Sequence, residues 1–171
     1  MERQILSSLD FKLHYGRAPM VFLNRLQRAA YTGQSDIGYE ISILAMDILL
    51  LEVKFREIDS AAKATAAVLA SRMILWFIDE IDNYMEIWTL NLKYYGYEKN
   101  PAKNLQDMVN FTLISVKNLV KQINVPIDDR PNLVIKYSSR SKHNSLLHKL
   151  KAHGLNDLNA HEVEGLWKKI F

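Results

Sequence analysis

The sequence predicts an all-α fold. One segment, 60–77, is crowded with alanines at positions 61, 62, 64, 66, 67 and 70. Short side chains along a helix let several neighbouring helices approach it closely. Elsewhere apolar residues recur at the three- and four-residue spacing of amphipathic helices, and no stretch alternates long enough to predict a strand. We therefore expect a core of about five helices with the alanine-rich one at its centre, followed by a helical C-terminal tail.

Composition sets limits on the class of protein. The 171 residues are 49% hydrophobic and 24% charged, which is typical of one globular domain. A net charge of +3 is too mild to indicate a class of partner. The absence of cysteine excludes disulfides and thiolate zinc sites. The most apolar stretch, 41–53, is interrupted by Asp47 and Glu52. It is shorter than the ~20 residues of a membrane span, so we expect a buried helix and no membrane contact.

The first half of the chain predicts three helices. One ends within 2–9, and the next begins at Pro19, because proline is tolerated at the first helical position, and ends near Tyr31. A long helix then runs from Asp36, a favourable N-cap, to Phe55. Its expected buried stripe is Ile37, Ile41, Leu44, Ala45, Ile48, Leu51 and Phe55.

The alanine-rich helix follows, with Asp59 or Ser60 as its N-cap and Phe77 as its last residue. An acidic loop, 78–87, leads to a short helix that Thr89 can cap and that ends at Gly96.

A further helix opens at Asn100-Pro101. Its apolar residues recur at helical spacing, and they are Leu105, Met108, Val109, Thr112, Val116, Leu119, Val120 and Ile123. Prolines at 126 and 131 predict a loop over 125–132. Three short helical patterns make up the tail, at 133–137, 146–153 and 157–170. We expect three parts in all: a helix end and linker (1–17), the main domain (18–124) and a tail packed on it (125–171).

Seven short segments form an ordered series along almost the whole chain. They are 5–13 (ILSSLDFKL), 19–25 (PMVFLNR), 46–52 (MDILLLE), the alanine-rich 61–73, 88–95 (WTLNLKYY), 136–137 (KY) and 141–143 (SKH). This series resembles the C-terminal cyclin box of the mitotic, A- and B-type cyclins. The pair of prolines that the family usually has before its third helix is absent, because 55–59 reads FREID. The resemblance implies a five-helix cyclin fold around the alanine-rich helix.

The resemblance also implies a function. Mitotic cyclins are regulatory subunits of cyclin-dependent kinases in cell division, and they act in the nucleus and cytoplasm. Most of their kinase contact comes from an N-terminal cyclin box, which these residues do not include. The partner-binding residues of this chain therefore stay unknown. Two alternatives remain: a cyclin-fold module that binds nucleic acid, as in general transcription factors, and a helical adaptor that no longer binds a kinase.

The sequence offers no catalytic, cofactor or metal site. It contains none of the glycine-rich phosphate loops, His-Glu-x-x-His helices or Gly-x-Ser-x-Gly elbows of common enzymes. His143, His148 and His153 recur every five residues, so on a helix they point about 140° apart and do not converge on a metal ion. We expect a binding protein without cofactors and without enzymatic activity.

Three further features have both a structural and a functional interpretation. Asp47 lies in the most apolar helix, and we interpret it as an acid bonded to a neighbouring helix or cap rather than as a perturbed carboxylate. The stretch 130–156 has six Lys or Arg and no Asp or Glu, which predicts either a surface for phosphate or acidic partners or a solvated tail. Trp88 and Tyr95 are interpreted as core residues rather than interface anchors.

Overall fold

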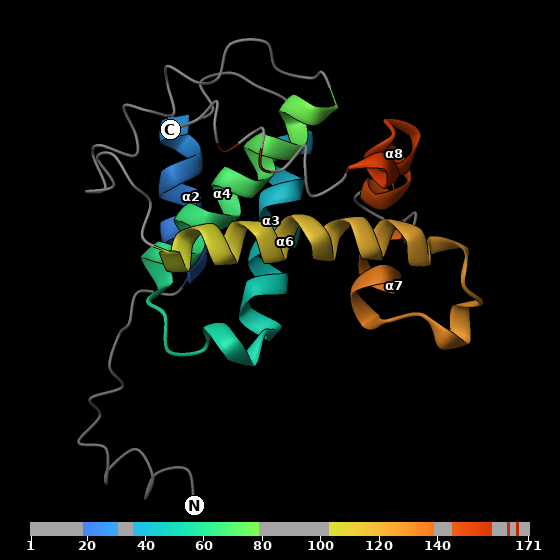
Figure 1. The fold of residues 1–171 in the computed structure, drawn as a ribbon, viewed down its shortest axis with the longest axis horizontal. Coiled ribbons are helices and arrows are strands. Elements are labelled where there is room, and N and C mark those ends of the chain that lie inside the picture. The colour runs from blue at the N-terminus through green and yellow to red at the C-terminus, as the bar shows by residue number, and fades with distance from the viewer. Residues whose placement is uncertain are drawn as a thin grey trace, which may run out of the picture.

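The computed structural model describes residues 19–30, 36–78, 103–138 and 145–158, together with Glu164 and Trp167 (Figure 1). All regular secondary structure in these residues is helical. The α-helices are α2 (Pro19–Ala30), α3 (Asp36–Leu51), α4 (Ser60–Phe77), α6 (Lys103–Lys121), α7 (Asn132–Ser138) and α8 (Leu146–Ala152). Four short 3-10 turns join them: η1 (Val53–Phe55), η2 (Gln122–Asn124), η3 (Ile127–Asp129) and η4 (Leu155–Asp157). The all-α prediction is confirmed for this part of the chain.

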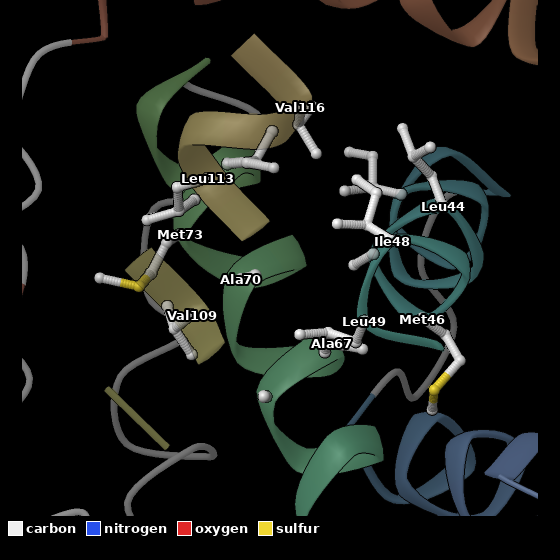
Figure 2. Packing of buried hydrophobic residues seen from close by; sticks show 14 of the residues in the cluster. Leu44, Met46, Ile48, Leu49, Ala67, Ala70, Met73, Val109, Leu113 and Val116 are labelled. Carbon is white, nitrogen blue, oxygen red and sulfur yellow. The ribbon is translucent and has the colours of Figure 1, made fainter. Parts of the chain in front are cut away.

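The alanine-rich helix α4 is the central element. Every residue from Ala62 to Leu75 is buried, so α4 has no solvent-exposed face over this length. It packs against α2, α3 and α6, and Figure 2 shows it running between α3 and α6. Alanines provide the close approach on these sides, since Ala64, Ala66, Ala67 and Ala70 are all fully buried. The predicted central position of this helix is therefore confirmed.

The start of α4 is fixed by a side-chain cap. Asp59 has an extended backbone, and its carboxylate accepts hydrogen bonds from the backbone N–H groups of Ala61 (2.7 Å) and Ala62 (3.0 Å). These two groups have no partner within the helix, so the cap satisfies donors that would otherwise be lost. Of the two predicted caps, Asp59 is the correct one.

Replacing Asp59 by alanine is expected to lower the free energy of unfolding by about 1 kcal/mol, because both N–H groups lose their acceptor. The change is measured by urea unfolding followed by circular dichroism. Asp59→Ser is the matched control, because serine also caps helices and should lose much less. Equal losses in the two variants would contradict the capping role.

Buried hydroxyl groups connect α3 to α4. The carbonyl oxygen of Gly38 accepts hydrogen bonds from the hydroxyl of Ser42 at 2.9 Å and from that of Ser71 at 2.8 Å. Ser71 belongs to α4, so this bond joins the two helices across the core. Both serines are completely buried, and their pairing avoids the cost of an unsatisfied polar group.

Some predicted boundaries were wrong. Helix α3 ends at Leu51, not at Phe55, because Glu52 takes an extended backbone and accepts a hydrogen bond from the N–H of Lys54, which starts η1. Asp36, expected to be the N-cap, is already the first helical residue. The predicted loop 125–132 contains the turn η3 and the first residue of α7.

The remaining predictions fall partly outside the described residues. These are the elements predicted within 2–9 and 88–96, the acidic loop beyond Ile78, and the helix start at Asn100-Pro101. Within the described part, the buried pattern from Leu105 to Ile123 is confirmed at every position named.

Candidate functional site: the C-terminal end of α3

A polar cluster joins the last third of α3 to the short tail helix α7. The carboxylate of Asp47 accepts a hydrogen bond from the Tyr137 hydroxyl at 2.6 Å and lies 2.5 Å from the ammonium group of Lys136. The side chain of Asp47 is 24% exposed and that of Lys136 is 57% exposed, so water reaches one side of the ion pair. We call these three residues the Asp47 cluster. It confirms that Asp47 is bonded to a neighbouring helix.

The Asp47 cluster is the polar part of the contact that holds α7 in place. A helix of seven residues is too short to be stable alone, so α7 depends on its packing. Val134 and Tyr137 provide its buried side chains, and Tyr137 also provides the hydroxyl bound by Asp47. Burial, then the hydrogen bond to Asp47 and the nearby charges of Asp47 and Glu40, raise the pKa of Tyr137 well above its ordinary value. Tyr137 therefore stays protonated in the folded protein.

The raised pKa predicts a loss of stability in alkali. Above about pH 10 an unfolded tyrosine loses its proton, whereas the folded Tyr137 keeps it, so rising pH favours unfolding. The stability of the wild type relative to Tyr137→Phe should therefore fall by about 1 kcal/mol between about pH 9 and pH 11. Urea unfolding of both proteins at each pH measures this difference. A constant difference over that range would contradict the prediction.

An open groove lies beside the Asp47 cluster, between α3, α6 and α7. Its volume is about 290 Å³. We call it the α3–α6–α7 groove, and its lining consists of Ile48, Leu51, Glu52, Phe111, Ser115, Asn118, Leu119, Gln122 and Leu133. Five of these side chains are apolar, and Glu52 is the only charged one. A groove of this composition can bind apolar side chains of a partner, with one carboxylate at its edge.

The groove exists because α3 ends early. The stripe predicted for a longer α3 would bury Leu51, but the chain turns at Glu52 and leaves Leu51 68% exposed. Phe55 is directed back into the core, where its ring meets that of Phe111 edge to face at 5.4 Å. Leu133 of α7 forms the opposite wall. The Asp47 cluster, which holds α7, therefore also holds one side of the groove.

Three of the four basic residues that the structure describes in the stretch 130–156 make contacts within the chain. Arg130 donates to the carbonyl of Val125 at 2.6 Å, Lys136 pairs with Asp47, and Lys151 donates to the side-chain oxygen of Asn124 at 3.0 Å. Leu146, Leu147 and Leu150 of α8 are fully buried. These contacts favour the interpretation of a tail packed on the core over that of a phosphate-binding surface.

The other candidate residues that the structure describes form no second site. His148 and His153 are exposed, and His143, Trp88 and Tyr95 lie outside the described residues. In the segments that the structure describes, no three His, Cys, Asp or Glu side chains gather as metal ligands would. None of the helices there is long and apolar enough to cross a membrane. Trp167 donates to the side-chain oxygen of Asn110 at 2.7 Å, so this residue of the tail contacts α6.

Sequence reasoning found one half of this site and missed the other. It predicted that Asp47 is bonded to a neighbouring helix or cap, but it did not identify the partners, which are 89 and 90 residues away. The sequence does contain a hint to these partners, because Lys136-Tyr137 is one of the segments in the cyclin-like series. For the groove, the sequence contains no clear hint apart from the apolar residue Leu51 directly before the acidic Glu52.

Comparisons with protein-family models, with curated proteins and with solved structures found no match to this chain. The class of this protein is therefore stated from its own fold and site. Within its described part, this is an all-α protein with a buried alanine-rich central helix and a docked helical tail.

Proposed function

We propose that this chain is the C-terminal cyclin-fold domain of a mitotic-type cyclin, and that its role is to support the regulation of a cyclin-dependent kinase. Two kinds of observation support the proposal. The sequence contains the ordered series of cyclin-like segments, and the alanine-rich segment of that series is the helix that α2, α3 and α6 surround.

The Asp47 cluster is the observation on which the proposal chiefly rests. It joins two segments that the resemblance singles out separately, 46–52 and 136–137. These segments lie far apart in the sequence, and their resemblance to cyclins rests on their residues alone. A direct bond between them is expected if both motifs are kept for one shared structural purpose.

The proposed mechanism is a shift of population. A regulatory subunit that binds only the active arrangement of a kinase draws the kinase toward that arrangement. In this scheme the first cyclin box makes most of the kinase contact, and the present domain stiffens it. A rigid support is what the packing around α4 can provide, because close-packed interiors resist deformation. No bond is made or broken by the chain itself.

A chimera tests the proposal. The first cyclin box of a B-type cyclin is joined to this chain, and binding to its cyclin-dependent kinase and the kinase activity are compared with those of the first box alone. We expect the chimera to bind and activate the kinase more strongly. The matched control joins the same box to an unrelated helical domain of similar size. A chimera no better than this control would contradict the proposed function.

A further inference from the structure

The α3–α6–α7 groove has the shape of a site for a helix. Along α6 and the turn η2 that follows it directly, the lining residues are Phe111, Ser115, Asn118, Leu119 and Gln122. Four of them are spaced by four, three and four residues, which places them along one face of the helix. That face extends for about 16 Å at 1.5 Å per residue, the length of about three helical turns. A partner helix of similar length can lie along it.

The chemistry of the lining specifies the face of such a partner. Ile48, Phe111, Leu119 and Leu133 offer apolar surface to a helix with apolar residues at three- and four-residue spacing. Leu51 is 68% exposed at the edge of the groove, and Ile114, one turn along α6 from Phe111, is 56% exposed. A bound helix would remove this apolar surface from water, which is the main favourable term in association.

The charge of the lining specifies the partner further. Glu52 is the only charged lining residue, so the groove has a net negative charge. One carboxylate oxygen of Glu52, Oε1, accepts a hydrogen bond from the backbone N–H of Lys54 at 3.2 Å. A basic residue on the partner complements this carboxylate, whereas an acidic one is repelled. Complementary charge of this kind selects partners as well as orientation.

We propose that the α3–α6–α7 groove binds an amphipathic helix of a partner protein, with an apolar face in the groove and a basic residue against Glu52. The groove is at the lower end of small-molecule sites, which enclose about 300–1,000 Å³, and it is open along its length. A helix with a few inserted side chains fits such a groove better than an enclosed ligand does. The proposal goes beyond kinase regulation and does not depend on it.

The first test uses two labelled, helix-stabilised peptides of about 14 residues. Both have leucines at every third or fourth position; one has arginines beside the apolar face, and its twin has glutamates there. Binding to the full chain is measured by fluorescence anisotropy. We expect the arginine peptide to bind at least about fivefold more tightly than its twin. Equal affinities, or no binding of the arginine peptide up to millimolar concentration, would overturn the proposal.

Variants of the chain locate the binding. Glu52→Gln keeps an acceptor for the Lys54 N–H and should lower the affinity for the arginine peptide about threefold. The control is Glu57→Gln, which changes an exposed glutamate outside the groove and should have no effect. Glu52→Lys should reverse the preference between the two peptides. An equal effect at both glutamates would show that only the overall charge matters, and it would overturn the assignment to Glu52.

Two blocking variants test the groove itself. Ser115→Trp fills its middle, and Asn118→Trp adds the same bulk at an exposed lining residue where folding is not at risk. Each should lower the affinity for the arginine peptide at least about tenfold, and the helix content of the chain should not change. Unchanged binding to Asn118→Trp would place the peptide elsewhere.

Sedimentation of the chain without peptide tests whether a second copy occupies the groove. Self-association that Asn118→Trp abolishes would identify a second copy as the occupant and would overturn the proposed partner.

Discussion

Replacing Ala67 by leucine is expected to lower the free energy of unfolding by about 3 kcal/mol, because a fully buried methyl group has no space for a larger side chain. Ala67 lies on the central helix, in the region where α4 packs against α3 (Figure 2). The neighbouring helix cannot move aside, since α4 is enclosed on its other sides as well. In a chain of this length the melting temperature should fall by about 6–12 °C.

Thermal unfolding followed by circular dichroism measures this effect. Ala152→Leu is the matched control, because it makes the same change at an exposed position of α8. Its effect should stay within about 0.5 kcal/mol. If Ala67→Leu were tolerated as well as Ala152→Leu, the dense packing around α4 would be wrong, and with it the structural part of the cyclin proposal.

The central helix is also the element that sequence reasoning predicted best. Its predicted range, 60–77, is the range observed. The signals involved are local, because alanine favours the helix and Asp59 supplies a cap directly before it. The close approach of several neighbours could be inferred from the alanines, whereas the burial of Lys63 and Arg72 could not, because charged side chains usually face water. Local chemistry and tertiary packing agree at this element.

The end of α3 was predicted less well, because tertiary contacts decide it. Apolar residues continue through Leu51, Val53 and Phe55, so spacing alone predicts one continuous helix. The observed turn at Glu52 places Phe55 against Phe111, a contact between residues 56 positions apart that no local pattern reveals. The exposure of Leu51 and the groove beside it both result from this turn at Glu52. The functional surface is therefore where local prediction failed.

The partners of Asp47 illustrate the same limit. A carboxylate within an apolar helix predicts that some partner exists, because a buried charge without one is costly. Which partner is chosen depends on how the tail folds back, and the sequence holds many lysines and tyrosines that could serve. The structure selects the adjacent pair Lys136 and Tyr137, so one acid holds two successive residues of α7.

Replacing Asp47 by alanine should lower the free energy of unfolding by about 2–3 kcal/mol. The Tyr137 hydroxyl then has no acceptor at a residue that is only 3% exposed, and Lys136 loses its ion pair. Asp47→Asn is the matched control, because the amide oxygen can still accept the hydroxyl. It should lose only about 1 kcal/mol, since the Lys136 side chain is more than half exposed and its pairing contributes little.

Tyr137→Phe separates the hydrogen bond from the remaining packing. If the bond is the main loss in Asp47→Ala, the double variant with Tyr137→Phe should be less destabilised than the sum of the single variants by about 1–2 kcal/mol. Additive losses would contradict the cluster as described. Because α7 has only seven residues and depends on its contacts with the rest of the chain, losing the Asp47 contacts should make its amides exchange hydrogen faster in Asp47→Ala, while those of α4 keep their protection. The same variant should also lower the affinity for the arginine peptide, although Asp47 does not line the groove. The reason is that Leu133 lines the groove only while α7 is docked.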